Sequence, residues 1–412
     1  MLKSYHKSKK KLTKPKKIFV TTGVGDCLDS STCSNWNLEG SRYPEIFSFD
    51  HDYGLQKCVT DEIQEFPQGL VGATGALINH KYPLVCGGEA SPRAQWDFAD
   101  FANFKQKVSG QEPWKVLETL FNPDRALRTC RMLRNGKWLP VKDTLLQEGQ
   151  IGANSVLLQE GRIGATSVLL DQGLTLFVTG GDNGVSYVNS TEFLIFDDNG
   201  TLIEQRQGPE MPSKSIGHCI LPLDLQGNQY LFVGGQGFGR STWVFDKKLE
   251  VFKPCPDMNL SYRHDPVCGA IWDTSFRKRY LRLSKNIGLN KITLVCNIVF
   301  RFAIIVGGYN RYSEQKPPAL ILDLSLPTKQ WKIVPELQLP VDLKSHQVVS
   351  LEDSLLILGG RDSQGDFKDD IYKLTCTRKL NCTVEIQPVK LSVKRGGHLA
   401  MLVPDNFVSN CQ

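Results

Sequence analysis

The stretch QYLFVGGQGFGRSTWVFD, residues 229–246, combines an apolar run, a glycine pair, a short loop and a second apolar run that ends in Asp. The same order recurs along the chain, where six apolar runs end in a glycine pair or its equivalent. These pairs end at Gly23, Gly88, Gly181, Gly235, Gly308 and Gly360. Self-similarity at a period of tens of residues predicts a repeat architecture, in which one supersecondary unit is copied many times.

Each unit contains enough apolar runs for four short strands. After the glycine pair and its loop, a run ends in Asp in four of the repeats, at Asp50, Asp197, Asp246 and Asp323. A further run carries Trp138 or Trp331, and a small residue or His precedes the next glycine-ended run. A four-stranded unit cannot bury both faces alone, so the units must stack around a ring. We expect the glycines to permit a close backbone approach near the axis. The repeat glycines are Gly23, Gly87, Gly88, Gly180, Gly181, Gly234, Gly235, Gly307, Gly308, Gly359 and Gly360.

This pattern resembles the kelch family of β-propellers over roughly residues 17–404. The first repeat departs from it, because Thr22 stands where the pair needs glycine, and several repeats lack the tryptophan. The resemblance implies an all-β, six-bladed kelch-type β-propeller. The first repeat begins directly on its glycine-ended strand and lacks the strand that precedes such a run in the other repeats. The C-terminal segment RGGHLAMLVP, residues 395–404, matches that missing strand. We therefore predict that the C-terminal strand closes the first blade.

Segments outside the repeat define the remaining organisation. We expect a basic disordered tail over residues 1–16, a C-terminal tail over 405–412, and insertions at about 89–129, 145–156 and 276–301. The first insertion lies in the second blade and contains EPWKVLETLF, whose apolar spacing predicts a partly helical loop. The second is one copy of a duplicated twelve-residue segment, LLQEGQIGANSV followed by LLQEGRIGATSV. Only one copy is needed in the sheet, and the other can lie in a surface loop, because lengthening a loop costs little entropy. We interpret the segment as a tolerated duplication; the alternative is a switch between two strand registers.

The charge of the chain is concentrated at its start. The net charge is +6, and the first seventeen residues hold eight lysines and no acid, so the remainder carries −2 (+6 minus +8). The lysine run lacks the interleaved aromatic residues that stack bases, so we expect no nucleic-acid partner. No apolar run is long enough for a membrane helix, so we expect no membrane span. We expect a monomer.

Two long loops carry aromatic residues that suit a binding surface. In an antiparallel four-stranded meander, the turns between second and third strands share one face with the blade-to-blade connections. The loops Val24–Pro44 and Glu89–Thr129 should therefore project on the same face, and loops on a rigid scaffold commonly carry binding residues. Aromatic residues are enriched among interface hot spots, although these could instead form the loops' own small core. The candidates are Trp36, Tyr43, Trp96, Phe98, Phe101 and Trp114.

The twelve cysteines favour disulfides over metal binding. No CxxC pair has the spaced partners that zinc sites require. We predict bridges within four pairs, and in the cytosol these residues would instead be reduced small hydrophobes. The candidate pairs are Cys27 with Cys33, Cys86 with Cys130, Cys255 with Cys268, and Cys376 with Cys382.

Four sequons support a secretory history. They lie at Asn189, Asn199, Asn259 and Asn381. N-glycosylation and disulfides both occur outside the cytosol, which favours an extracellular protein. The sequence as it begins has no signal peptide, which favours a cytoplasmic location as the alternative.

The chain lacks a recognisable catalytic constellation. His218, His346 and His398 occupy equivalent repeat positions, with His264 in a similar setting, as structural residues would. We therefore do not expect these four histidines to converge on copper. The segment GGQGFG, residues 234–239, does not fit a dinucleotide loop because a strand follows it. We therefore expect no enzyme activity, no cofactor and no metal. The sequence favours a noncatalytic, extracellular module that binds a protein or glycan. The alternatives are a cytosolic kelch scaffold or substrate receptor, and a sugar-active or copper-dependent propeller enzyme.

Overall fold

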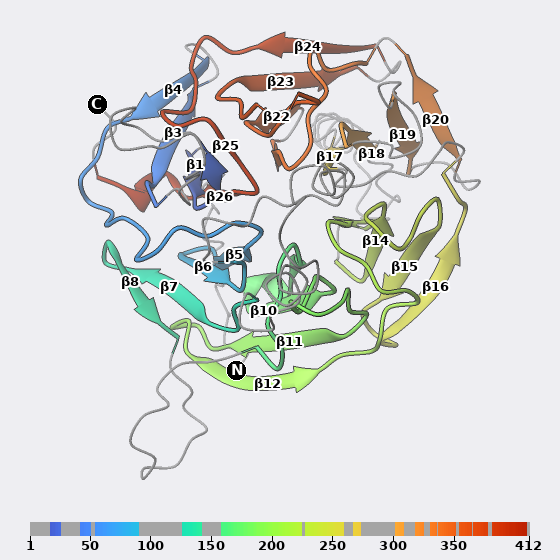
Figure 1. Cartoon of the computed structure of the whole chain (residues 1–412), viewed down its shortest axis with the longest axis horizontal. Coiled ribbons are helices and arrows are strands. Elements are labelled where there is room, and N and C mark those ends of the chain that lie inside the picture. The colour runs from blue at the N-terminus through green and yellow to red at the C-terminus, as the bar shows by residue number, and fades with distance from the viewer. Residues whose placement is uncertain are drawn as a thin grey trace, which may run out of the picture.

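The computed structural model shows six four-stranded antiparallel sheets arranged as the blades of a propeller (Figure 1). The structure describes residues 17–25, 42–50, 54–89, 126–141, 158–224, 227–258, 267–272, 301–308, 318–324, 330–335, 337–351, 354–364, 366–377 and 381–409. Residues 90–125 of the expected partly helical loop, the insertion 145–156, residues 276–300 of the last insertion and the tail 1–16 lie outside these residues. The all-β, six-bladed prediction is confirmed.

Each blade runs from an innermost strand at the axis to an edge strand at the rim. The innermost strands contact one another around the ring: β26 (Leu399–Val403), β5 (Thr74–Ile78), β9 (Thr166–Leu170), β13 (Cys219–Pro222), β17 (Val267–Trp272) and β21 (Gln347–Ser350). The second strands are β1 (Lys17–Thr21), β6 (Tyr82–Cys86), β10 (Thr175–Thr179), β14 (Gln229–Val233), β18 (Arg301–Val306) and β22 (Ser354–Leu358). The glycine pairs follow these second strands.

The outer half of each blade is a hairpin that completes the sheet. The third strands are β3 (Glu45–Asp50), β7 (Cys130–Arg134), β11 (Thr191–Phe196), β15 (Thr242–Asp246), β19 (Ala319–Asp323) and β23 (Ile371–Cys376). The rim strands are β4 (Gly54–Cys58), β8 (Lys137–Pro140), β12 (Leu202–Gln207), β16 (Val251–Cys255), β20 (Trp331–Val334) and β24 (Cys382–Ile386). Two of the repeated Asp residues, Asp197 and Asp246, accept hydrogen bonds from amides of the hairpin turns that follow them. The Asp197 carboxylate accepts hydrogen bonds from the Asn199 and Thr201 amides at 2.9 and 2.7 Å.

The C-terminal strand closes the ring, as predicted. β26 pairs antiparallel with β1, from Lys17 opposite Val403 to Thr21 opposite Leu399. A short ladder between β2 (Val24–Gly25) and β25 (Arg395–Gly396) reinforces the closure. After β26 the chain forms the 3₁₀ helix η3 (Asp405–Phe407), and Val408 is buried against the first blade. The first blade therefore contains the two ends of the propeller.

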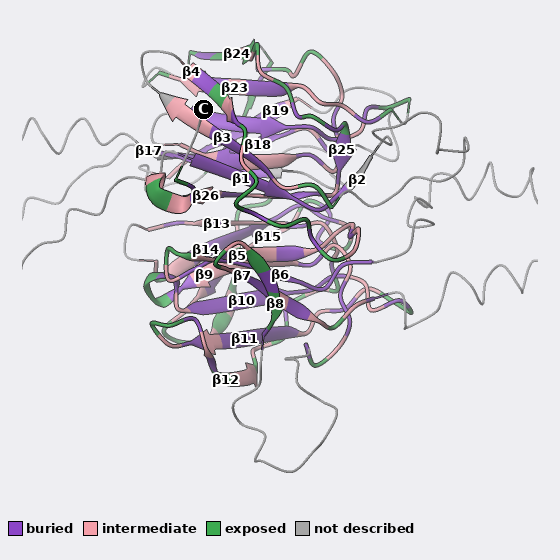
Figure 2. Cartoon of the chain, turned by 90° about the vertical axis from the view of Figure 1, so that its left-hand side faces the viewer, coloured by how far each residue is buried: buried purple, intermediate pink, exposed green. Residues whose placement is uncertain are grey.

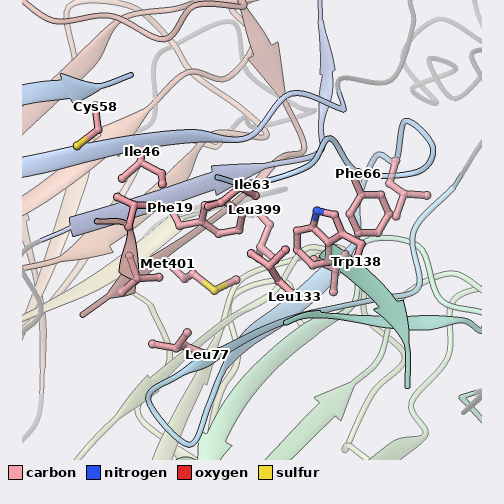
Figure 3. Packing of buried hydrophobic residues seen from close by; sticks show 14 residues of the cluster. Phe19, Ile46, Cys58, Ile63, Phe66, Leu77, Leu133, Trp138, Leu399 and Met401 are labelled. Carbon is pink, nitrogen blue, oxygen red and sulfur yellow. The ribbon is translucent and has the colours of Figure 1, made fainter. Parts of the chain in front are cut away.

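The cores lie between neighbouring blades. Between the first two blades, Phe19 of β1 and Trp138 of β8 belong to one cluster, and the Trp138 ring meets Phe66 edge-on at 4.7 Å between centroids (Figure 3). Trp331, the other repeat tryptophan, is also buried between blades. Both tryptophans lie on rim strands, so their large side chains fill the widening space between blades far from the axis.

Histidine or alanine side chains fill the narrow space near the axis. His346 precedes β21, and it packs between Gly307 of the previous blade and Gly360 of its own. A Cβ at Gly307 would stand 2.5 Å from His346 Cε1, and one at Gly360 would stand 2.7 Å from His346 Cβ. Larger residues than glycine therefore do not fit on either side of the ring. Ala73 and Ala165 occupy the equivalent positions in two other blades.

A belt of backbone hydrogen bonds joins blades around the axis. One residue before the His or Ala position, the backbone is left-handed in five blades, at Gly72, Gly164, Gly217, Ser345 and Gly397. The amides of the four glycines each donate to the carbonyl of the equivalent residue in the preceding blade, as from Gly164 to Gly72 at 2.8 Å and from Gly397 to Ser345 at 2.7 Å. The belt crosses the closure between the last and first blades, so it stabilises the complete ring.

Candidate binding face

One face of the propeller carries the loops between second and third strands and the connections between blades. We call it the diglycine face, because the glycine pairs, the turns that follow them and the blade-to-blade connections lie there. Figure 2 shows β2 and β25 at this face and the end of the chain toward the opposite one. The chain leaves β1 at Thr21 and β6 at Cys86 on this face. The loops Val24–Pro44 and Glu89–Thr129 therefore start from the same face, as predicted from the meander.

One predicted aromatic residue of this face lies within the described structure. Tyr43 is 40% exposed, and its backbone carbonyl accepts a hydrogen bond from Arg395 Nη1 at 3.1 Å. The backbone of Tyr43 is thus held by a buried neighbour. The other candidates, Trp36, Trp96, Phe98, Phe101 and Trp114, lie outside the described residues.

A short ordered loop on the third blade presents an apolar residue that the sequence analysis missed. Val185 is 52% exposed at the tip of the turn between β10 and β11. The Asn183 side-chain oxygen accepts hydrogen bonds from the amides of Val185 and Ser186 at 3.0 and 2.9 Å. This Asx-type turn fixes the tip at low entropic cost on binding. Its only sequence signal is DNG, residues 182–184, after the glycine pair.

The third and fourth blades are connected across this face. The Tyr187 hydroxyl donates to Gln236 Oε1 at 2.6 Å, and Asn183 Nδ2 donates to Glu160 Oε2 at 3.3 Å. These bonds join the tip loop to the neighbouring blade and to the connection that precedes β9. The described part of the diglycine face is therefore a preorganised surface.

Two buried ion pairs hold this face, and neither was expected from the sequence. Arg162, 1% exposed, donates from Nε and Nη2 to Glu192 Oε1 at 3.1 and 2.9 Å. Arg395 repeats the arrangement in the first blade, with Nη2 2.6 Å from Glu45 Oε1. Each arginine also donates to a carbonyl in the glycine-pair turn, Gly180 for Arg162 and Thr22 for Arg395. The only signal in the sequence is an arginine four residues before an innermost strand.

The buried histidines are neutral residues of the blade interfaces. Burial lowers the pKa of His218 and of His346 to about 3. The pKa of His398 lies well below its usual value because of burial, with Arg395 and His346 adding to the effect. His218 Nε2 contacts the Thr179 hydroxyl at 2.7 Å, while neither ring nitrogen of His346 or His398 has a hydrogen-bond partner among the described residues. These side chains are closed off from any substrate.

The structure contains three disulfides within the described residues. The predicted pairs Cys86–Cys130 and Cys376–Cys382 are confirmed, and both join directly opposed residues of neighbouring strands. The predicted Cys255–Cys268 pair is wrong, because Cys268 of β17 is bonded to Cys219 of β13. Cys255 lies on a rim strand, whereas Cys219 and Cys268 lie on adjacent innermost strands. Cys27 and Cys33 lie outside the described residues.

Three of the four sequons fall within the described structure. Asn199 and Asn381 are exposed in the turns between third and fourth strands, on the face opposite the diglycine face. Asn189 is half-buried, and its side chain donates to Glu210 Oε2 at 3.1 Å. Asn259 lies outside the described residues.

Fold and site together define a six-bladed, disulfide-bonded β-propeller with a preorganised loop face. No protein-family model matches the chain, and no curated protein matches it. Within the described ranges, no group of three or more potential ligand side chains could hold a metal ion. No helix in those ranges is long and apolar enough to cross a membrane. The segment GGQGFG forms a turn that leads into β15.

Proposed function

We propose that the protein is a noncatalytic, extracellular interaction module of the kelch type, which binds a protein or glycan partner as a monomer through the diglycine face. The observation that carries the proposal is the preorganised surface of that face, with Tyr43 and Val185 exposed on braced loops. The kelch assignment draws on the repeated glycine pairs, Asp-ended strands and rim tryptophans. A rigid ring with variable loops is suited to protein binding.

The extracellular location draws support from the disulfides. Disulfides persist in oxidising compartments and are rare in the cytosol. Exposed sequons at Asn199 and Asn381 are compatible with attached glycans. The cytosolic scaffold or substrate receptor is the main alternative, and it requires reduced cysteines. A copper enzyme would require accessible histidine ligands, whereas His218, His346 and His398 are buried.

The location is tested by intact mass spectrometry of protein from its native tissue. We expect the six cysteines of the three described disulfides to resist alkylation until they are reduced. Deglycosylation should lower the mass, and Asn199→Gln and Asn381→Gln variants should each lack one glycan increment. Complete alkylation without reduction, together with an unglycosylated mass, would assign the protein to the cytosol.

The binding face is tested by surface variants with a control on the opposite face. Labelled protein carrying Tyr43→Ala and Val185→Asp should bind cells of its own tissue at least about tenfold more weakly, since one hot-spot residue alone contributes about 2 kcal/mol. Leu249→Asp alters a residue that is 59% exposed in the opposite face and should bind like the wild type. Protease and glycosidase treatment of the cells separates a protein partner from a glycan.

Trp96→Ala with Trp114→Ala extends the same test to the long loop of the second blade. We expect weaker capture with an unchanged melting curve. Equal binding by all variants would count against the diglycine face as the contact surface.

A further inference from the structure

A group of three basic side chains lies on the second blade, on the face opposite the diglycine face. We call Lys81, Arg134 and Lys137 the basic edge. Lys81 precedes β6, Arg134 ends β7 and Lys137 begins β8. Lys81 and Lys137 are exposed, and Arg134 is half-buried. Since these strand ends meet at one edge of the sheet, the three cations are neighbours.

The hairpin between β7 and β8 places two of these charges directly opposite each other. Its two-residue turn, Asn135–Gly136, has φ values of 47° and 75°, as in the tight turns typical of hairpins. Arg134 is the register partner of Lys137, so their Cβ atoms lie about 5 Å apart on the same face of the sheet. Like charges in this arrangement are destabilising unless an anion neutralises them.

The Tyr82 ring places Lys81, the third cation, beside Arg134. Lys81 Nζ lies 4.8 Å from the centroid of the Tyr82 ring, and Arg134 Cζ lies 4.7 Å from the same centroid. Gly200 of the neighbouring blade leaves space for this group, because a Cβ there would stand 2.8 Å from Tyr82 Cδ2 and 3.2 Å from Arg134 Nη2. The Tyr82 ring therefore orients two cations that would otherwise be flexible.

No acidic side chain neutralises the basic edge within the described structure. None of the ion pairs among those residues includes Lys81, Arg134 or Lys137. Two lysines in the fourth blade are paired by contrast, Lys247 with Asp171 and Lys253 with Asp246. The nearby Asp197 carboxylate already accepts two amides of its own turn. The basic edge is thus a concentrated, oriented and uncompensated positive charge.

We propose that the basic edge binds the sulfate groups of a sulfated glycosaminoglycan. A guanidinium and two ammonium groups can donate charge-assisted hydrogen bonds to the oxygens of a sulfate. A nucleic acid fits less well, because the Tyr82 ring already carries two cations and is not an open stacking platform. The three disulfides indicate an oxidising compartment, where sulfated polysaccharide is the abundant polyanion. The site is separate from the diglycine face.

The test measures binding of a defined heparin oligosaccharide to the full chain, including the N-terminal lysines. The variant Lys81→Gln, Arg134→Gln, Lys137→Gln removes the basic edge. The control variant Lys247→Gln, Lys253→Gln, Lys390→Gln removes the same number of positive charges from ion-paired positions. Binding is titrated at several salt concentrations, and the thermal midpoint of each variant is recorded.

We expect the basic-edge variant to lose about tenfold in affinity for heparin, the order expected for three exposed charge contacts. Its salt dependence should become shallower, because fewer counterions are exchanged. The control should bind like the wild type. Lys137→Gln alone should weaken binding without lowering the thermal midpoint, since it also relieves the repulsion from Arg134.

Equal losses in the two triple variants, or no loss in either, would overturn the proposal, because binding would then follow net charge or the lysine-rich start. Single-stranded DNA and phosphatidylserine vesicles serve as competing probes at the same salt concentration. Tighter binding to either probe than to heparin, lost in the basic-edge variant, would overturn the assignment of a sulfated glycan as the partner.

Discussion

One of the two differences between the copies of the duplicated segment explains which copy lies in the sheet. The copies differ at Gln150 and Arg162, and at Asn154 and Thr166. In the structure the second copy supplies β9, and Arg162 forms the buried ion pair with Glu192. A glutamine at that position would leave Glu192, itself fully buried, without its cation. The arginine therefore favours the second copy in the sheet, because a buried carboxylate without a partner costs several kcal/mol.

This explanation leads to a prediction for Arg162→Gln. The variant gives the second copy the first copy's residue at this position, and we expect the free energy of unfolding to fall by about 3–5 kcal/mol. Urea unfolding measures the change. The double variant Gln150→Arg with Arg162→Gln moves the arginine to the first copy. If the arginine selects the copy, the double variant should recover most of the lost stability, whereas no recovery would mean that the register is set elsewhere.

At the scale of the strand, the sequence predicts those features of the fold that follow from short, repeated residue patterns. Apolar runs, glycine pairs and Asp-ended strands recur, so the blades, their number and the closing strand could be predicted. Thr22 replaces a glycine yet adopts φ 61°, as the equivalent glycines do. The order of the strands along the chain also placed the loops after the glycine pairs between second and third strands, as the structure has them.

Contacts between different blades could not be predicted from the sequence. The Cys219–Cys268 disulfide joins two innermost strands that are separated by the whole outer part of a blade, so the sequence favoured the nearer Cys255. The Arg395–Glu45 pair joins the two ends of the chain in the same way. For the candidate face, chain topology predicted the side on which the long loops start. The exposure of Val185 depends on a turn geometry that leaves only a weak sequence signal.

At the scale of the whole molecule, three blade interfaces depend on neutral histidines. His218 lies between the third and fourth blades, His346 between the fifth and sixth, and His398 at the closure between the sixth and first. The glycines on either side leave no space for a counter-ion beside His346. Protonation in the folded ring is therefore unfavourable, which is why burial lowers the pKa of His218 and His346 to about 3.

Stability should consequently fall as the pH drops below about 6.5, the usual pKa of histidine in an unfolded chain. Below that pH the unfolded chain binds protons that the folded ring does not, and this difference persists until the pH reaches the folded pKa. Each histidine then contributes a loss of about 1.4 kcal/mol per pH unit. Urea unfolding between pH 6 and pH 5 measures this slope, in a range where most carboxylates remain ionised.

The variant His346→Ala with His398→Ala places alanine where two other blades have Ala73 and Ala165, so the fold should tolerate it. Its cavities lower stability at neutral pH, but its slope should be shallower than that of the wild type by about 3 kcal/mol per pH unit. His80→Ala, which alters an exposed histidine in the second blade, should keep the wild-type slope. If the double variant kept that slope as well, the acid sensitivity of the ring would have to reside in groups other than the histidines at its closure.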